Sequence, residues 1–242
     1  LIFVFLYRFF TAYQTKRGPV MTIKWIKTAH KGLRYYEHPT RRHGKKKDRY
    51  YAIRFKVDRN EYSYGVGWLS DSEIERYERF KFPKRRAEWL LGRWAAKRLL
   101  ASCLNELEPD QYSLLSIESA VGGAPYAVWK GMPLSGCLSI SHRADLAAAA
   151  WCPIEISRVG IDIEVIEFKS ATFIHDYFTQ QEAALVFAQP TEHHALAASL
   201  VWSAKEALLK ALQTGLSIDT RQVEVSLDPI VLDEDWQPLS IV

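Results

Sequence analysis

Apolar and polar positions along the chain recur with two different periods, which predict interspersed helices and strands. Helical spacing is expected over residues 84–102, 179–188 and 195–213. A further helix should begin at Ser70-Asp71-Ser72-Glu73, and Thr179 with Glu182 forms a capping-box pattern. Strands are expected at residues 50–57, 137–142, 145–152, 158–166 and 222–227. Because these elements follow no regular β-α-β order and no repeat of fixed period stands out, the predicted fold class is α+β.

The helix expected over residues 84–102 has two unlike faces. One face carries Leu90, Trp94 and Ala101, and another carries Arg86, Arg93 and Lys97. Together with six Lys and Arg in residues 41–49, this basic face leaves a nucleic-acid-binding module open as a remote alternative. Residues 1–20 hold three basic residues and no acid, so from Met21 onward 29 basic residues face 28 acidic ones. That near-neutral balance counts against nucleic acid as a partner.

The first 20 residues are a doubtful extension. Residues 1–10 are apolar, yet they lack the flanks of a signal peptide and are shorter than the about 20 residues that span a bilayer. Met21 is therefore the expected start, and no membrane association is expected; a short membrane-surface anchor is the less favoured alternative. Hydrophobic residues make up 48% and charged residues 25%, as in a globular protein. The three cysteines show no CxxC spacing, which indicates thiols in a reducing compartment, so we expect a cytoplasmic protein.

Two carboxylates stand two residues apart in Val159-Gly160-Ile161-Asp162-Ile163-Glu164. On a strand, Asp162 and Glu164 point to one side, while the flanking apolar residues form the opposite, buried face. Carboxylate oxygens are the ligands that Mg²⁺ prefers, and Mn²⁺ accepts them as well. The pattern predicts either a cation site or a strand with one solvated side, and by itself it does not choose between them.

The helix that follows places a second polar group on one face. Trp202, Glu206, Lys210 and Gln213 are spaced by four, four and three residues, so they share a side. A Glu-to-Lys pair at this spacing can simply stabilise a solvated helix by about 0.2–0.5 kcal/mol. A tryptophan on the same face is harder to explain in that way.

A histidine, His142, ends the strand Leu138-Ser139-Ile140-Ser141-His142, where it could donate a hydrogen bond to a phosphate or serve only the structure. Other catalytic patterns are missing. The sequence contains no GxSxG, HExxH, GxGxxG or GxxxxGK[ST] pattern, which argues against a serine hydrolase, a histidine zinc site, a dinucleotide fold and a P-loop enzyme.

The order and spacing of these motifs resemble the 4′-phosphopantetheinyl transferase family, in its larger, surfactin-synthetase-activating type. The resemblance covers residues 68–228 and rests on Gly123-Ala124-Pro125, Leu138–His142, the Gly-x-Asp-x-Glu of 160–164, and Trp202-Ser203-Ala204-Lys205-Glu206-Ala207-Leu208-Leu209-Lys210. It implies a pseudo-dimer of two similar α+β halves, expected at residues 21–155 and 156–242. The second half should carry the metal site, and its C-terminus looks short for this type.

The resemblance also implies a reaction. Phosphopantetheine would pass from coenzyme A, as substrate, to a serine of an apo acyl or peptidyl carrier protein, with release of 3′,5′-ADP. Asp162, Glu164 and Glu206 would hold Mg²⁺ or Mn²⁺, Glu206 would act as general base, and Lys210 would stabilise the departing phosphate. Coenzyme A would contact Ser141, His142, Lys205 and Lys210. A monomer is expected.

A second alternative is a degenerate family member that binds coenzyme A or a carrier protein without turnover. It is motivated by Ala124, which stands where the family pattern has Lys or Arg, and by the short C-terminus. Intact Asp162, Glu164, Glu206 and Lys210 count against it.

Overall fold

The structure, a computed structural model, describes residues 2–8, 21–27, 51–56, 65–104, 107–144, 146–153, 158–227 and 237–241. Contacts divide the chain into two units, and the division falls between Ser157 and Arg158. We call residues 1–30 with 158–242 unit 1, and residues 31–157 unit 2. The sequence had placed the junction at residues 155–156 and residues 21–30 in the first half.

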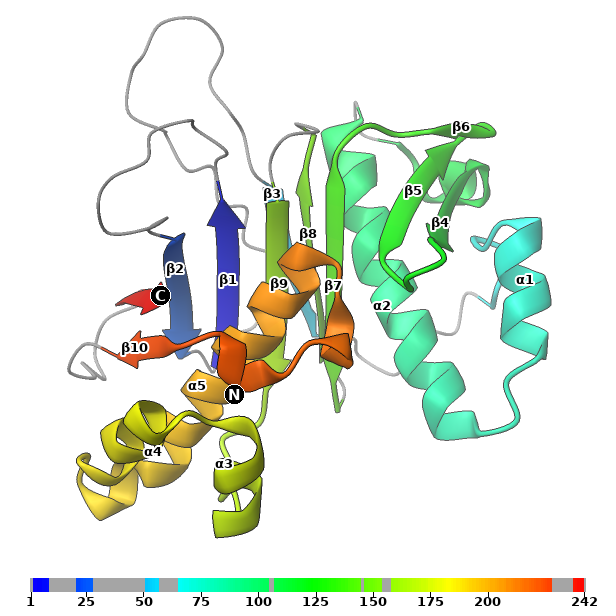
Figure 1. The fold of residues 1–242 in the computed structure, drawn as a ribbon. Helices are drawn as coiled ribbons and strands as arrows, with labels where there is room; N and C mark the ends of the chain where they lie inside the picture. Colours follow the sequence, from blue (N-terminus) through cyan, green and yellow to red (C-terminus); the bar gives the residue numbers. More distant parts are fainter. Residues whose placement is uncertain are drawn as a thin grey trace, which may run out of the picture. The chain divides into compact units, whose positions relative to one another are not determined.

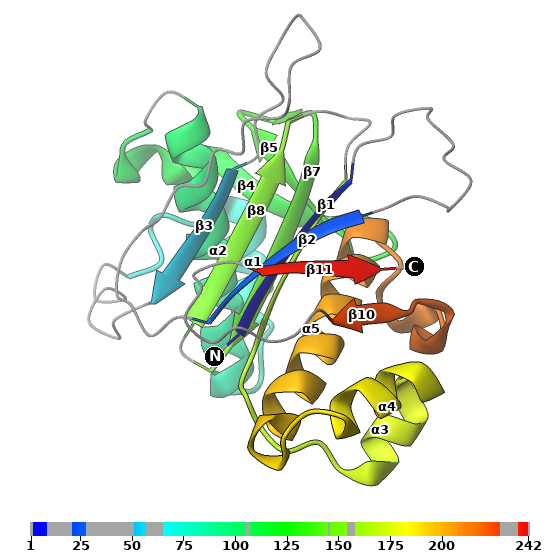
Figure 2. The same ribbon diagram turned by 90° about the vertical axis from the view of Figure 1, so that its left-hand side faces the viewer.

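Unit 1 is built on a five-stranded antiparallel sheet in the order β10-β11-β2-β1-β9. Its strands are β1 (Ile2–Arg8), β2 (Met21–Lys27), β9 (Arg158–Glu164), β10 (Val225–Leu227) and β11 (Gln237–Ile241). The long helix α5 (His194–Leu212) packs on β9 and β1. The shorter helices α3 (Ala171–Tyr177) and α4 (Gln180–Phe187) precede it, and Figure 2 shows β11 beside β2. Residues 2–8, considered a doubtful extension from sequence, thus form a strand between β2 and β9.

Unit 2 holds the remaining elements. A sheet of β3 (Tyr51–Lys56), β8 (Leu146–Cys152) and β7 (Cys137–Arg143) is covered by helix α2 (Pro83–Cys103). A second sheet contains β4 (Leu115–Ser119), β5 (Pro125–Trp129) and β6 (Met132–Pro133), and helix α1 (Asp71–Glu78) contacts β4 (Figure 1). The alanines of β8, residues 147–150, are completely buried, and Ala147 and Ala149 belong to the same core cluster as the apolar residues of α2.

The α+β class and most predicted elements are confirmed. Helix α2 matches the expected 84–102, and α5 matches the expected 195–213 within one residue at each end. Both capping boxes form as their sequences indicate, at Ser70 and at Thr179. The last predicted strand is shorter than expected, because Thr220–Gln222 forms a 3₁₀ turn before β10 begins at Val225.

The predicted basic face of α2 is wrong. Lys97 is fully buried and Arg93 nearly so, and both lie near the carboxylate of Glu73. Burial lowers the pKa of Arg93 to about 10, although Glu73 opposes this shift. These two side chains are unavailable to a nucleic-acid backbone, and the other part of that proposal, residues 41–49, lies outside the described residues.

Among the described residues, each unit contains a buried lysine that is held by the same kinds of partners, an arrangement called a clamp below. In unit 2, Lys97 forms an ion pair with Glu73 and donates hydrogen bonds to the carbonyl oxygens of Trp68 and Tyr112. The Glu73 carboxylate also accepts a hydrogen bond from the backbone N–H of Ile117 in β4. In unit 1, Lys205 forms an ion pair with Glu182 and donates hydrogen bonds to the carbonyl oxygens of Thr220 and Val223. The Glu182 carboxylate also accepts a hydrogen bond from the backbone N–H of Val225 in β10. Both glutamates also close the capping box of a short helix. This repeated arrangement is visible in three dimensions, although no repeat stood out in the sequence.

The sequence predicts cysteines that remain thiols and no membrane-spanning segment, and both predictions can be compared with the described residues. All three cysteines are thiols, as their spacing indicated. Among the helices that the structure describes, none combines the length and apolar character needed to cross a membrane.

Candidate active site

Helix α5 lies unusually close to β9 at Gly160. A Cβ atom added to Gly160 would lie 1.8 Å from the Ala207 carbonyl oxygen and 3.0 Å from the Ala211 amide nitrogen. Glycine is needed here because two backbones approach each other, not because of its φ angle. Since alternate residues of a strand share a side, Asp162 and Glu164 stand on the Gly160 side, which faces α5.

Asp162 is buried between the strand and the helix, with 3% of its surface exposed. Its Oδ2 accepts a hydrogen bond from Ser203 Oγ at 2.8 Å, and its Oδ1 lies 2.6 Å from Lys210 Nζ. The alternative that Asp162 lies on a solvent-exposed side of the strand is therefore wrong, because α5 covers the face of β9 that carries it. A buried charge with no cation and no donors would be costly, and here it has both.

Glu206 shares this environment. Burial raises the pKa of the Glu206 carboxyl above its ordinary value, Lys210 opposes the rise, and the charges of Asp162 and Glu164 add to it. Glu164 is half-buried at the end of β9, and its Oε2 lies 3.8 Å from Lys169 Nζ. Three carboxylates and one lysine thus influence one another across the α5–β9 contact.

The chemistry of these donors suits a hard divalent cation. Carboxylate oxygens are suitable ligands, and a cation would offset both the burial of the Glu206 charge, which is the main cause of its raised pKa, and the smaller repulsion from Asp162 and Glu164. As the side chains stand, no three His, Cys, Asp or Glu residues in the described ranges form a group that could hold a metal ion. In this arrangement the positive charge beside Asp162 is the ammonium of Lys210, with which it forms an ion pair.

Trp202, which a solvated helix face did not explain, belongs to an aromatic cluster. Its ring packs edge-on against Phe173 at 4.9 Å and Tyr177 at 5.2 Å between ring centroids. Both partners lie on α3, so the cluster ties α3 to the Glu206 face of α5. Lys169 Nζ lies 5.4 Å from the Phe173 ring centroid, which places a cation beside the same cluster.

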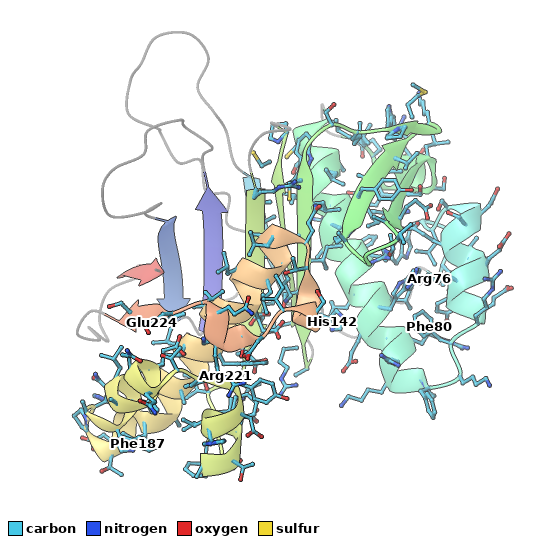
Figure 3. The ribbon with its side chains drawn as sticks, in the orientation of Figure 1. Arg76, Phe80, His142, Phe187, Arg221 and Glu224 are labelled. Atoms are coloured by element: carbon cyan, nitrogen blue, oxygen red, sulfur yellow. The ribbon has the colours of Figure 1, made fainter. Side chains whose placement is uncertain are left out.

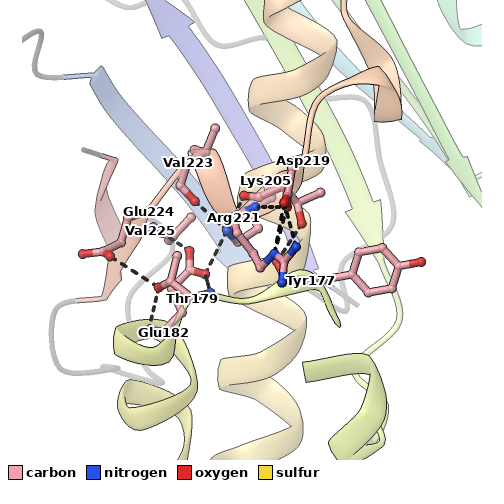
Figure 4. A network of polar contacts seen from close by, with 10 residues as sticks. Tyr177, Thr179, Glu182, Lys205, Asp219, Arg221, Val223, Glu224 and Val225 are labelled. Carbon is pink, nitrogen blue, oxygen red and sulfur yellow. Dashed lines mark hydrogen bonds and ion pairs between the residues drawn. The ribbon is translucent and has the colours of Figure 1, made fainter. Parts of the chain in front are cut away.

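Lys205 lies on the other side of α5, in the network of Figure 4. It is fully buried, lies 2.8 Å from Glu182 Oε2, and donates to the carbonyl oxygens of Thr220 and Val223. An ammonium has three N–H donors, and these three acceptors use all of them. A direct contact between Lys205 and a coenzyme A phosphate, which the resemblance implied, does not fit this geometry.

Ser141 and His142 lie in unit 2, at the end of β7. Ser141 is buried and His142 is exposed, as alternation along a strand requires. Figure 3 shows His142 at that strand end. Helix α2 contacts this part of β7, since a Cβ added to Gly92 would lie 3.1 Å from Ile140 Cγ2 and 3.5 Å from His142 Cδ2.

Two residues with evident roles were not singled out from sequence as site residues. From the sequence, Ser203 is recognised only as part of a motif, and Glu182 only as a helix cap and as a residue that resembles the family. A usable signal did exist, since Trp94-Ala95-Ala96-Lys97 and Trp202-Ser203-Ala204-Lys205 share the pattern Trp-x-Ala-Lys. Aligning the two would have suggested a buried lysine in each and an unusual serine in the second.

Comparison with known proteins supplies the class of this site. Residues 158–231, which contain β9, α5 and the polar groups between them, match the family model of the 4′-phosphopantetheinyl transferase superfamily. The resemblance to this family predicted from the sequence is therefore confirmed over that segment.

Individual relatives agree with this assignment. The chain is 27% identical over 164 residues to the 4′-phosphopantetheinyl transferase HetI of Nostoc sp. (strain PCC 7120), covering 66% of each chain. It is 30% identical over 162 residues to the L-aminoadipate-semialdehyde dehydrogenase-phosphopantetheinyl transferase of Schizosaccharomyces pombe, covering 62% of this chain and 60% of that one. The chain thus spans less than two thirds of the length of either relative.

Proposed function

We propose that this protein transfers 4′-phosphopantetheine from coenzyme A to a serine hydroxyl of an apo acyl or peptidyl carrier protein, releasing 3′,5′-ADP. The observation that best supports the proposal is the meeting of Asp162, Glu206 and Lys210 across the α5–β9 contact, within the segment that matches the superfamily. The two named relatives are phosphopantetheinyl transferases, which agrees with this chemistry.

Glu206 is suited to the role of general base. A carboxylate whose pKa is raised accepts a proton more readily near neutral pH than an ordinary carboxylate does. The carrier serine oxygen would form a bond to the β-phosphorus of coenzyme A while its proton passes to Glu206. The phosphorus–oxygen bond to 3′,5′-ADP would break, and the Lys210 ammonium would stabilise the charge on the departing phosphate.

Asp162, Glu164 and Glu206 would hold a magnesium or manganese ion. When bound, such an ion neutralises and orients the diphosphate of coenzyme A. Before the ion enters, Lys210 supplies the positive charge beside Asp162. Because the Lys210 side chain is 28% exposed, it can move aside without crossing a packed core.

The remaining assignments rest on the resemblance and on the buried clamps. Ser141, His142 and Lys210 are kept as contacts of coenzyme A, whereas Lys205 is assigned a structural role because its donors are used internally. The pseudo-dimer of two similar halves remains part of the proposal and is supported by the matching clamps of Lys97 and Lys205. The proposal also includes that the enzyme is a monomer and is located in the cytoplasm.

The test is intact-mass spectrometry of an apo carrier protein incubated with coenzyme A, Mg²⁺ and the full chain. The expected result is a gain of one phosphopantetheine on the carrier, which is absent with EDTA and strongly slowed with Glu206→Gln. Glu192→Gln serves as the matched control, because Glu192 is an exposed glutamate in the same unit, at the 3₁₀ turn before α5. No gain on acyl and peptidyl carriers alike, with coenzyme A binding retained in calorimetry, would instead support a degenerate, binding-only protein.

A further inference from the structure

Ser203 is a polar residue in the middle of a helix and has no contact with solvent. Its residue is 0% exposed, and its Oγ donates to Asp162 Oδ2 at 2.8 Å. A serine within a helix commonly returns its hydroxyl to a backbone carbonyl one turn earlier. A hydroxyl has only one hydrogen to donate, so the bond to Asp162 excludes that alternative. The hydroxyl therefore serves the carboxylate rather than its own helix.

The close approach at Gly160 makes this bond possible. With only hydrogen on the Gly160 Cα, the α5 backbone can lie against β9, and a Cβ there would be 1.8 Å from Ala207 O. Ser203 lies one turn before Ala207, on the part of α5 that reaches Asp162. The short side chain of serine can reach the Asp162 carboxylate because the two backbones lie this close.

The corresponding position in unit 2 supplies an independent comparison. In the shared pattern Trp-x-Ala-Lys, Ala95 of α2 stands where Ser203 stands in α5. Ala95 is also 0% exposed, so both positions accept a small buried side chain. Helix α2 packs on β8, whose sequence LAAAAWC contains no acidic residue. The hydroxyl occurs in the unit whose facing strand carries Asp162, which indicates that packing alone does not require it.

The two oxygens of Asp162 have partners of different kinds. Oδ2 accepts a hydrogen bond from the buried hydroxyl of Ser203, whereas Oδ1 faces the ammonium of Lys210, whose side chain is partly exposed. We propose that Ser203 is a positioning residue, which fixes the rotation of the Asp162 carboxylate so that Oδ1 is presented to a divalent cation when Lys210 moves away. This inference rests on the proposed function, since it assigns Asp162 to the metal.

The experiment is a titration of Mn²⁺ into the full chain, followed by electron paramagnetic resonance of the free ion, without coenzyme A or carrier protein. Losing a group that orients a metal ligand typically weakens metal binding by about 10–100-fold. We expect such a loss for Ser203→Ala, and recovery in Ser203→Thr, which keeps the hydroxyl. In transfer assays, Ser203→Ala should raise the Mn²⁺ concentration needed for half-maximal rate more than it lowers the rate at saturating Mn²⁺.

The matched control is Ser199→Ala. Ser199 is also 0% exposed and lies one turn earlier on α5, but its hydroxyl bonds the Val165 carbonyl rather than Asp162. The Ser199→Ala variant should have a melting temperature lowered about as much as that of Ser203→Ala, but its Mn²⁺ affinity should equal that of the wild-type chain. If Ser203→Ala binds Mn²⁺ within twofold of Ser199→Ala, or if the wild-type chain binds no Mn²⁺, the positioning role is refuted.

Failure of this inference can be told apart from failure of the proposed function. Mn²⁺ binding that depends on Ser203, with no modification of any carrier, would support the positioning role and refute the transferase. Carrier modification by the wild-type chain, together with equal Mn²⁺ affinity in Ser203→Ala and Ser199→Ala, would support the transferase and refute the positioning role.

Discussion

Replacing Gly160 by alanine should both destabilise the protein and weaken its metal site. The added Cβ would lie 1.8 Å from Ala207 O, about 1.2 Å inside the 3.0 Å below which real contacts essentially do not occur. The carbonyl carbon of Ala207 and the amide nitrogen of Ala211 are also at 2.9 Å and 3.0 Å. Because all three atoms are backbone, no side-chain rotation can relieve the overlap, and α5 must move away from β9.

The expected cost follows from that geometry. Overpacking a core typically costs about 1–3 kcal/mol, and an obstacle made of backbone belongs at the upper end of that range. Alanine also restricts the unfolded chain and returns about 0.4–1 kcal/mol. A net loss of about 2–2.6 kcal/mol corresponds to a fall in melting temperature of roughly 4–10 °C for a chain of this size. A shift of α5 by about 1 Å would carry Ser203 and Lys210 away from Asp162, and displacements of that size cost about 100-fold in rate.

Thermal unfolding followed by circular dichroism measures the first effect, and Mn²⁺ titration measures the second. Gly67→Ala is the control, because Gly67 is exposed, has no positive φ, and a Cβ added there would meet no atom within 4 Å. It should leave the melting temperature unchanged or slightly raised. If Gly160→Ala melts within 1 °C of the wild-type chain, the two backbones are not as close as described and the reasoning is wrong.

Three further predictions concern charged groups. Glu206→Gln should lower the transfer rate by about 10²–10⁴-fold, as expected for loss of a general base. The metal-free protein should melt no lower, because the variant removes a charge that is disfavoured mainly by burial and to a smaller extent by Asp162 and Glu164. Lys205→Met should cost about 3–5 kcal/mol in urea unfolding, because it leaves the buried Glu182 charge uncompensated. The double variant Lys205→Met/Glu182→Gln should lose less, since no unpaired charge is then buried. Mn²⁺ affinity, measured by calorimetry, should fall as the pH drops toward the raised pKa of Glu206, because a carboxyl must lose its proton to bind metal.

Each of these predictions has a contrary outcome. A Glu206→Gln protein that modifies the carrier at the wild-type rate would exclude Glu206 as base. Equal unfolding free energies for Lys205→Met and the double variant would mean that the Lys205–Glu182 pair is not buried as described. Mn²⁺ affinity with the same pH profile in the wild type and Glu206→Gln would show that another group controls the titration.

The elements were accessible from sequence because they depend on neighbours within one or two turns. The capping boxes at Ser70 and Thr179 and the limits of α5 follow from spacings of three and four residues. Amphipathic spacing was less informative about what covers each face. It placed Arg93 and Lys97 on a polar face of α2, but that face meets Glu73 and the Trp68 carbonyl and is buried.

By itself, the sequence determined which residue types could perform the chemistry, in which order they occur, and which family they resemble. Only the tertiary structure decided which charged groups meet. Ser203 and Lys210 reach Asp162 across 41 and 48 residues of chain, and Lys205 turns instead to Glu182. The physical reason is that local spacing assigns a side chain to a face of its helix or strand. Whether that face meets water, a carboxylate or a backbone carbonyl depends on the element packed against it.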